Sequence, residues 1–295
     1  MRVLHLVPNA GALSEMWLSD IVTAPGRHPS SFWSVEPPGD EYRWSRPPER
    51  VVARSATLLR AARQVARRTP SAAVPLWGLG GRSLARLRPD LVHAHFGTLG
   101  ALWTPVLARL GLPVVVSFYG IDASAHHLRR PPWTEWYGAL FDHASAVLAE
   151  GPAMEARLHR LGASVDRTRV IRLPLGIGDL PATDDVARLA DEGPHLPYDV
   201  VLGGRFVEKK GFHVAIEAFA RAFPSGPERL LLVGEGPEGA RLRGLVARRG
   251  IGERTTFAGP VPIDRFARHL QDACVAVFPS VTAGDGDGEG GAPMT

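Results

Sequence analysis

The chain has 295 residues, of which 45% are hydrophobic and 22% charged, so it can bury the core of one large domain or of two medium-sized domains. The single cysteine, Cys274, excludes an internal disulfide, and no run of about 18 apolar residues offers a membrane-spanning segment. The net charge of +4 is too small to identify a polyanionic partner. Because the apolar run before Pro8 is too short for a secretory signal, we expect a cytoplasmic protein. Peripheral attachment to the inner face of the cell membrane stays an open alternative.

Alternating strands and helices are predicted over the first two-thirds of the chain. The run from Arg2 to Val7 predicts a short buried strand, and a loop with Gly11 then leads into a helix that Ser14 can cap. Further strands are predicted at residues 32–35, 91–95, 114–118, 146–149 and 169–173, with helices at 99–110, 134–141 and 152–161. Strands separated by crossover helices indicate a mostly parallel, doubly wound α/β sheet.

A basic stretch interrupts this series between Arg43 and Arg88, with 11 arginines and one acidic residue, Glu49. Over residues 50–68 a helical wheel separates an arginine arc from an apolar arc, as in a helix that lies on anionic lipid. An ordinary surface helix that packs its apolar arc on the sheet is the favoured interpretation, and the membrane role stays open. Nucleic acid is not an expected partner, because no aromatic stacking platform or base-reading motif accompanies the charge.

Residues 176–197 are rich in Gly, Pro and Asp and predict a domain boundary. We expect a first domain at 1–178, a linker at 179–198 and a second domain at 199–295. The strands of the second domain are predicted at residues 199–202, 230–233, 255–257 and 275–278. Such a sheet commonly has about five or six strands, so the second domain is expected to be incomplete. Cys274 sits in the apolar stretch of the last strand and is expected to be buried and inert.

The segment from Gly203 to Phe219 has the layout of a phosphate-binding loop. A short strand runs into two glycines and three cations, Arg205, Lys209 and Lys210, and a helix then opens just after a further glycine. These two lysines are the only lysines of the chain, and all its arginine and lysine residues other than these two are arginines. A lysine pair at this loop is therefore less expected to be incidental surface charge. A solvated basic turn is the alternative interpretation.

Seven motifs then occur in a fixed order. They are ALSEMWL at 12–18, VHAHFG at 92–97, SFYGID at 117–122, GGRFVEKKGF at 203–212, LLLVGEGPE at 230–238, TTFAGPV at 255–261 and VFPSVTAGDGDGEGGAP at 277–293. In this order the chain resembles the family 4 glycosyltransferases, closest to the subgroup that builds exopolysaccharides and similar surface glycans. The resemblance implies the GT-B fold, an α/β architecture in which two Rossmann-like domains face a cleft that binds a nucleotide sugar.

On the donor side, the resemblance implies that Arg205 and Lys210 bind the diphosphate of the leaving nucleotide, whose growing negative charge fixed cations stabilise. Lys209 is expected to face solvent. Glu289 resembles a family residue that contacts the donor sugar, and the remaining donor-binding positions implied by the motifs are Gly11, Gly204, Gly234 and Val261. No metal or cofactor is expected. Asp285 and Asp287 imitate a metal-binding DxD pair, but their glycine-rich stretch resembles the one that leads into the family's donor-sugar loop, and the other ligands of a calcium loop are absent from the sequence.

On the acceptor side, SFYGID corresponds to a family stretch that commonly reads HGxD. Tyr119 therefore stands where a histidine is common in the family, and Asp122 matches the aspartate of the family stretch. Because an unperturbed tyrosine has a pKa near about 10, Asp122 is the better candidate to contact the acceptor hydroxyl as a catalytic residue. His95 ends a strand at the edge where ligands gather in such sheets, and an acceptor contact and a purely structural role are both open for it.

The resemblance implies an enzyme that moves a hexose from a UDP- or GDP-linked donor to a lipid-linked or polysaccharide acceptor, retaining the anomeric configuration. A truncated GT-B protein without activity, which binds a partner or a membrane, is the alternative. The family's second donor-binding glutamate would fall at position 297, outside this sequence.

Overall fold

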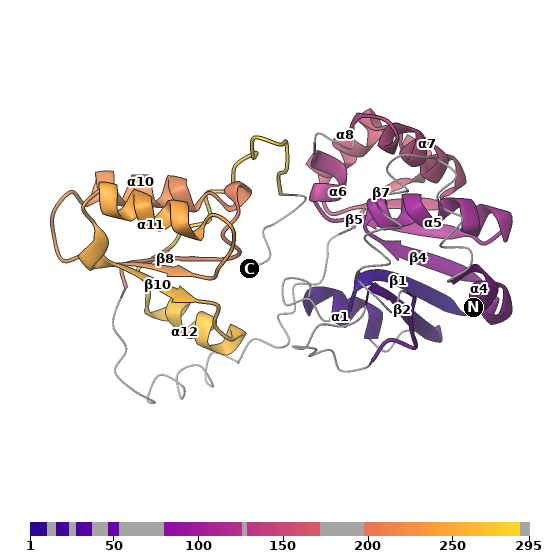
Figure 1. Cartoon of the computed structure of the whole chain (residues 1–295), viewed down its shortest axis with the longest axis horizontal. Helices are drawn as coiled ribbons and strands as arrows, with labels where there is room; N and C mark the ends of the chain where they lie inside the picture. Colours follow the sequence, from indigo (N-terminus) through magenta and orange to yellow (C-terminus); the bar gives the residue numbers. More distant parts are fainter. Residues whose placement is uncertain are drawn as a thin grey trace. The chain divides into compact units, whose positions relative to one another are not determined.

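The computed structural model describes residues 1–10, 16–23, 28–36, 47–52, 80–125, 129–171 and 198–289. The chain divides into two compact units (Figure 1). Unit 1 comprises Met1–Pro174 together with Asp285–Ala292, and unit 2 comprises Leu175–Gly284 together with Pro293–Thr295. Each unit is built around its own parallel sheet.

Unit 1 contains a seven-stranded sheet in the order β3-β2-β1-β4-β5-β6-β7, and every neighbouring pair is parallel. The strands are β1 (Val3–Asn9), β2 (Ser30–Glu36), β3 (Arg50–Val51), β4 (Leu91–His95), β5 (Val114–Phe118), β6 (Ala146–Ala149) and β7 (Thr168–Val170). The order reverses between β1 and β4, because the chain builds outward from β1 to β3 and then returns to the other side of β1. In open parallel sheets, ligands bind beyond the carboxyl ends of the strands at such a reversal.

Helices cover both faces of this sheet (Figure 1). They are α1 (Met16–Thr23), α4 (Arg82–Leu87), α5 (Gly97–Arg109), α6 (Ile121–Ser124), α7 (Trp133–His143) and α8 (Pro152–Arg160). Successive side chains of a strand point to opposite faces. Leu4 and Leu6 of β1 accordingly share a core cluster with Trp103 of α5, while Val7 shares another with Leu18 of α1. Helices α5 and α1 therefore pack on opposite faces.

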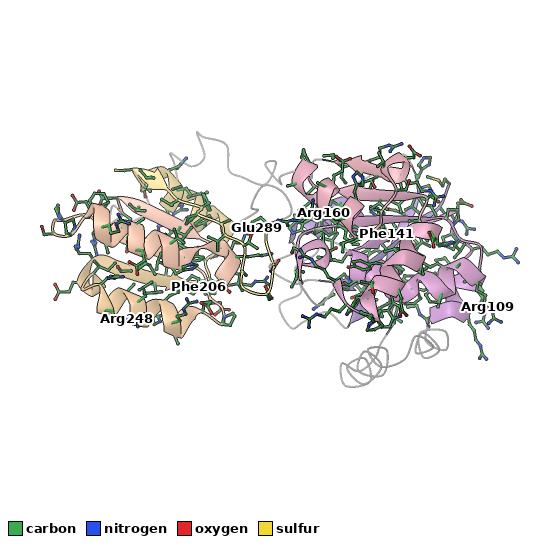
Figure 2. The ribbon with its side chains drawn as sticks, turned by 90° about the horizontal axis from the view of Figure 1, so that it is seen from above. Arg109, Phe141, Arg160, Phe206, Arg248 and Glu289 are labelled. Carbon is green, nitrogen blue, oxygen red and sulfur yellow. The ribbon has the colours of Figure 1, made fainter. Side chains whose placement is uncertain are left out.

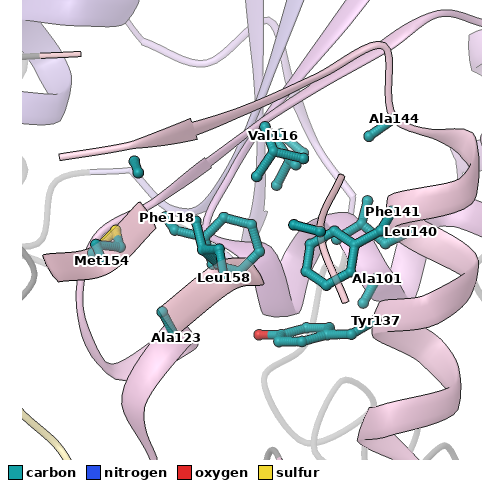
Figure 3. Packing of buried hydrophobic residues seen from close by; sticks show 14 of the residues in the cluster. Ala101, Val116, Phe118, Ala123, Tyr137, Leu140, Phe141, Ala144, Met154 and Leu158 are labelled. Atoms are coloured by element: carbon teal, nitrogen blue, oxygen red, sulfur yellow. The ribbon is translucent and has the colours of Figure 1, made fainter. Parts of the chain in front are cut away.

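The largest cluster of unit 1 lies where α7 and α8 pack on β5 (Figure 3). The rings of Phe118 and Tyr137 meet edge to face with centroids 5.8 Å apart, and Phe141 and Leu158 complete the contact. Fully buried aromatic and aliphatic side chains of this size each contribute roughly 1.5–3 kcal/mol of burial free energy. Arg109, at the end of α5, lies exposed at the periphery of the unit (Figure 2).

Unit 2 contains a four-stranded parallel sheet in the order β10-β9-β8-β11. Its strands are β8 (Val200–Gly203), β9 (Leu230–Val233), β10 (Thr255–Gly259) and β11 (Val275–Ala276), and its helices are α10 (Phe212–Ala222), α11 (Gly239–Arg248) and α12 (Ile263–Asp272). All four residues of β9 are buried. Its Leu232 shares a cluster with Phe219 of α10 and Leu242 of α11, whereas Leu231 shares another with Phe266 of α12, so helices cover both faces here as well.

The predicted α/β alternation is confirmed, and β4, β5, β6 and β9 have the predicted bounds. The helix predicted from Arg50 is wrong at its start. Arg50 and Val51 pair in parallel with Trp33 and Ser34 at the sheet edge, and the Arg50 guanidinium lies over the Trp33 ring, 5.5 Å from its centroid. The rest of that stretch, residues 53–68, lies outside the described residues, as does the predicted linker apart from Tyr198.

Cys274 also departs from the prediction, because it is exposed. It precedes the edge strand β11, where Val275 is itself 52% exposed, so its apolar neighbours do not build a buried environment. None of the helices in the described ranges combines the length and the apolar character that crossing a bilayer requires.

Candidate functional site

In unit 2, the loops after β8 and β9 meet beyond the carboxyl ends of their strands. The backbone N–H of Phe206 donates to the carbonyl of Glu235 (2.7 Å), and the N–H of Glu238 donates back to the carbonyl of Phe206 (3.0 Å). The Phe206 ring anchors the junction in the core against Phe212, with centroids 4.6 Å apart (Figure 2). The segment that resembles a phosphate loop is thus fixed to its neighbour by main-chain bonds.

Glycines permit this close approach. A Cβ atom on Gly234 would lie 2.0 Å from the carbonyl oxygen of Gly204, and one on Gly211 would lie 1.8 Å from that of Pro279. Both positions have positive φ, +126° for Gly234 and +69° for Gly211, which other residues rarely adopt. The loops after β8, β9 and β11 therefore depend on glycine to come together at one edge.

The three cations of the first loop differ in exposure. Arg205 is exposed and Lys210 is partly exposed, whereas Lys209 is only 8% exposed, so the prediction that Lys209 faces solvent is wrong. The segment after β11 explains the burial. Its Val281 N–H donates to the Lys209 carbonyl (2.8 Å), and its Gly284 N–H donates to the Glu208 carboxylate (3.2 Å), so this segment covers the turn.

Helix α10 begins at Phe212, immediately after the left-handed Gly211, and no side chain caps it. The N–H groups of a helix's first turn point outward and carry the positive end of its dipole, which favours a bound anion. Arg205 and Lys210 belong to the loop that leads into this helix. Val261, the last predicted donor contact of unit 2, follows β10 and packs against the cluster of Phe266.

In unit 1, Asp122 is buried and its carboxylate accepts backbone hydrogen bonds. One oxygen, Oδ2, accepts from the N–H of Gly97 (2.7 Å), and Oδ1 accepts from the N–H groups of Tyr119 (2.9 Å) and Gly120 (3.0 Å). Burial raises the pKa of Asp122 to about 6, although these backbone bonds act in the opposite direction. The carboxylate fixes the turn after β5 to the start of α5. Its predicted contact with an acceptor stays a prediction.

His95 and Tyr119, the other acceptor-side candidates, are brought together by a hydrogen bond of 2.6 Å between the Nδ1 atom of His95 and the hydroxyl of Tyr119. His5 joins them, with its Nδ1 atom 2.9 Å from Nε2 of His95. His93 lies beside them and bonds to the hydroxyl of Ser117 (2.8 Å). Burial, reinforced by the neighbouring imidazoles, lowers the pKa of His93 to about 3 and holds that of His95 well below its usual value. Sequence reasoning missed His5, His93 and Ser117.

Gly11 lies outside the described residues. Glu289 is partly buried and belongs to unit 1 rather than unit 2, where its backbone carbonyl accepts a long bond from Arg157 (3.4 Å). The neighbouring carboxylates bond within their own segment and to α6. Asp285 accepts from the backbone N–H of Asp287 (2.9 Å), and Asp287 accepts from the hydroxyl of Ser124 (3.2 Å).

Two family models match the chain. Residues 11–176 match the glycosyl transferase 4-like domain, and residues 197–293 match the glycosyl transferases group 1 family. The putative colanic acid biosynthesis glycosyltransferase WcaL of Escherichia coli (strain K12) is 30% identical over 217 residues, which is 71% of this chain and 51% of WcaL. The amylovoran biosynthesis glycosyltransferase AmsK of Erwinia amylovora is 29% identical, over 68% of this chain and 48% of AmsK. The chain thus spans about half the length of these curated relatives.

Among solved structures, the fold is similar to Anabaena HepE in complex with UDP and glucose, with a TM-score of 0.68 at 20% identity over 96% of this chain and 75% of that chain. A sucrose-phosphate synthase from Thermosynechococcus elongatus gives a TM-score of 0.61 at 19% identity, over 95% of this chain and 75% of that chain. Both family matches are consistent with the two parallel-sheet units and with the loops at the carboxyl edge of unit 2. The chain belongs to the glycosyltransferases with a 4-like first domain and a group 1 second domain, and it has the GT-B fold.

Proposed function

We propose that this chain binds a nucleotide sugar through unit 2 and transfers its hexose to a lipid-linked or polysaccharide acceptor of a surface glycan. The observation that carries the proposal is the edge of unit 2, where Arg205 and Lys210 lie in a glycine-shaped loop that leads directly into α10. Cleavage of a sugar from a nucleoside diphosphate builds negative charge on the departing diphosphate. Preorganised cations and a helix N-terminus stabilise that charge without moving.

The donor is proposed to be a UDP- or GDP-linked hexose. HepE, which shares the fold, has been crystallised in complex with UDP and glucose, and this supports a uridine donor as the first to test. The curated relatives include glycosyltransferases of colanic acid and amylovoran biosynthesis, which supports a glycan acceptor. We further propose that the reaction retains the anomeric configuration and takes place at the cytoplasmic face of the membrane.

The proposed reaction needs no metal, because Arg205 and Lys210 supply the positive charge that a divalent cation supplies in other enzymes. Two observations on Asp285 and Asp287 support this. The exposed Asp285 carboxylate accepts from the Asp287 backbone N–H, whereas the Asp287 carboxylate is buried against Ser124, so the two do not form an open pair of metal ligands.

Calorimetric titration of the chain with UDP, GDP and ADP in the presence of EDTA tests the donor site. We expect one nucleotide to bind saturably, and Arg205→Ala and Lys210→Ala each to weaken that binding about 10-fold to 100-fold, the range for a lost charge-assisted hydrogen bond. Transfer or hydrolysis of the matching nucleotide sugar should fall at least as far, since the charge grows in the transition state.

Arg221→Ala is the matched control, because Arg221 is an exposed arginine in the last turn of the same helix, at the end away from the loop. It should bind the nucleotide like the unaltered chain. Wild-type affinity in both loop variants would contradict the proposed role of the cations. Absence of saturable heat with every nucleotide would instead favour an inactive binding protein.

A further inference from the structure

Four polar side chains of unit 1 share one face of its sheet, in strands that would ordinarily be apolar. Buried parallel strands are usually apolar on both faces, and burying a polar group costs free energy unless it is hydrogen-bonded. In β4, Val92 and Ala94 point into the clusters on the α5 face, so the alternating residues point to the α1 face. The same alternation in β1 and β5 places the whole polar set on that face: His5, His93, His95 and Ser117.

The hydrogen bonds of this set are diagonal and lead toward the carboxyl edge of the sheet. His5 is in register with His93 but bonds to His95, two residues further along β4. His95 is in register with Ser117 but bonds to Tyr119, two residues further along the chain. Each step therefore crosses to the next strand and moves one pleat toward the edge. Among the residues that the structure describes, this chain of bonds runs from His5 in β1 to Tyr119 just beyond β5.

Ring geometry separates this chain from its neighbour His93. The rings of His5 and His95 are tilted by only 22° with centroids 5.2 Å apart, and those of His95 and Tyr119 by 7° with centroids 6.0 Å apart. With the nitrogen and oxygen atoms between them at bonding distance, these rings meet edge to edge in nearly one plane. His93 instead stacks face to face on His95, with centroids 4.1 Å apart, and stands outside the chain.

The three histidines also offer potential metal-ligand atoms within 4.8 Å of one another. A bound Zn²⁺ needs about 2.0–2.1 Å to each nitrogen and lies roughly in the plane of every ring that binds it. Nδ1 of His5 and Nε2 of His95 face each other at 2.9 Å, which leaves room for a proton and not for an ion. The ring of His93 is stacked on His95 and so lies beside that plane rather than in it. The arrangement is that of a hydrogen-bonded relay.

Both imidazoles of the relay can stay neutral in either of two proton arrangements. In one, the Tyr119 hydroxyl donates to His95 and its oxygen can accept a bond from a ligand. In the other, His95 donates to the Tyr119 oxygen, and the hydroxyl proton can point to a ligand. The lowered pKa of His95 agrees with a neutral relay, because burial penalises the imidazolium. Tyr119 can thus accept from a ligand in one arrangement and donate to it in the other, and neither arrangement carries a buried charge.

Tyr119 ends the relay among aromatic side chains at the place where the strand order reverses. Trp17 of α1 meets its ring edge to face with centroids 4.5 Å apart, and Phe96 does so at 4.9 Å, and all three side chains are partly exposed. Phe96 has a φ of +76°, a conformation that costs a bulky residue roughly 1–3 kcal/mol and that concentrates at functional sites.

We propose that Tyr119, supported by His95 and His5 and flanked by Trp17 and Phe96, binds a neutral sugar hydroxyl of the glycan acceptor. This inference rests on the proposed function and specifies the ligand of its acceptor side. A hydroxyl both donates and accepts, which matches a tyrosine that can do either. A carboxylate or phosphate only accepts and would fix the relay in one arrangement beside neutral, buried imidazoles. Tyr119 contacts the ligand, and His95 and His5 act through it as positioning residues.

The test uses the full chain and three probes, D-glucose, D-galactose and D-glucuronate. Each is titrated while the side-chain ¹⁵N signals of His95 and His5 and the indole signal of Trp17 are followed by NMR. We expect a neutral hexose to shift these signals saturably, and glucuronate to bind more weakly. Because the relay is neutral, the ¹⁵N shifts of His95 should report a change of tautomer rather than protonation.

Tyr119→Phe keeps the ring contacts but removes the hydroxyl, and should weaken hexose binding about threefold to tenfold, the range for one neutral hydrogen bond. His95→Asn can keep a partner near the Nδ1 position but loses the bond to His5, and should give a smaller loss. His93→Gln is the matched control. It alters the histidine that stacks on His95 outside the relay and can still bond to Ser117, so hexose affinity should be unchanged.

The inference is overturned by wild-type hexose affinity in Tyr119→Phe, by glucuronate binding as tightly as the hexoses, or by the absence of any hexose that shifts the Trp17 and His95 signals. A loss in His93→Gln as large as that in Tyr119→Phe also overturns it, because the effect would then be a general disturbance of the cluster. Nucleotide affinity measured on the same samples separates the two proposals, since UDP or GDP binding depends on unit 2. Failure of nucleotide binding alone would count against the proposed function only.

Discussion

Buried histidines make the stability of unit 1 sensitive to acid. A histidine whose pKa is lowered in the folded state binds its proton mainly after unfolding, so the free energy of unfolding falls as the pH drops from about 6.5 toward the folded value. For His93, whose folded pKa is about 3, the loss between pH 7 and pH 5 should be about 2 kcal/mol. His95 acts in the same direction, whereas the raised pKa of Asp122 acts in the opposite one.

His93→Gln removes the contribution of His93 to this pH dependence of the unfolding free energy. Glutamine does not titrate, so the unfolding free energy of the variant should fall less than that of the unaltered chain between pH 7 and pH 5, by about 2 kcal/mol. Urea unfolding at both pH values, followed by a signal from unit 1, measures the difference. His5, His95 and Ser117 surround the site in both proteins, and their contributions largely cancel. Parallel pH profiles for the two proteins would show that His93 is not held neutral by burial.

Single residues were predicted well where their chemistry is local and poorly where it depends on neighbours from other strands. Arg205 lies, as predicted, in a glycine-rich loop after a strand, and it is exposed; its contact with a ligand stays a prediction. Lys209 looks equivalent in sequence but is buried, because a segment some 70 residues later bonds to its carbonyl. The relay of His5 and His95 needs strand register, although the alternating polar residues of three apolar strands were a signal that could have suggested it.

At the scale of elements, the loop between β8 and α10 depends on Gly211 for two separable reasons, its positive φ and the lack of space for a Cβ. Gly250 offers a comparison, because its φ of +68° is nearly that of Gly211 at +69°, yet no atom lies within 4 Å of where its Cβ would stand. Gly250→Ala should therefore lower the unfolding free energy by only the conformational term, roughly 1–2 kcal/mol.

Gly211→Ala should lower the stability of unit 2 by more than Gly250→Ala, because its Cβ would clash with the backbone of Pro279 rather than with a movable side chain. It should also weaken nucleotide binding, since the segment after β11 must shift away from the loop that holds Lys210. Urea denaturation and calorimetry on both variants check this. Equal stability losses would show that the close approach to Pro279 is not maintained in solution.

Four strands, β4, β5, β6 and β9, were predicted with their exact bounds, because buried parallel strands are short apolar runs between turn residues. The elements that were not predicted are β3, α4 and α6, with two, six and four residues, and the ten-residue helices α11 and α12. The first three are too short to show a hydrophobic period. Val51 becomes a strand residue through pairing with β2 rather than through its own neighbours in sequence.

At the scale of the molecule, the two units have separate cores, since none of the five hydrophobic clusters of the described residues draws members from both. Damage to one core should therefore leave the chemistry of the other unit intact. Leu140→Ala removes a fully buried side chain from α7 and should destabilise unit 1 by roughly 2–5 kcal/mol. The nucleotide affinity of unit 2 should stay unchanged at temperatures where unit 1 remains folded.

Calorimetric unfolding with and without the bound nucleotide measures both effects. We expect Leu140→Ala to move one transition to lower temperature, while the nucleotide raises the other by mass action. Ile216→Ala in α10 is the reciprocal variant, because Ile216 is equally buried in the core of unit 2. A single transition that both substitutions shift together would contradict independent cores.

The whole fold was more predictable than its parts. Strands alternating with helices imply parallel α/β sheets, and right-handed crossovers leave few ways to order the strands. The reversal of strand order beside β1 then determines where ligands gather in unit 1. The side chains that meet at this edge, and the hydrogen bonds between them, depend on strand register and on the face of the sheet to which each residue points. A single sequence does not encode these locally.

The exposed Cys274 has a practical consequence. As the sole thiol of the chain, it can take a maleimide fluorophore or a nitroxide spin label without any other cysteine being removed. A label there would sit beside β11, in the same unit as the loop of Arg205 and Lys210. One added cysteine at an exposed position of unit 1, such as Arg109→Cys, would complete a donor and acceptor pair. Energy transfer between the two labels would then report whether the distance between them changes when a nucleotide is added.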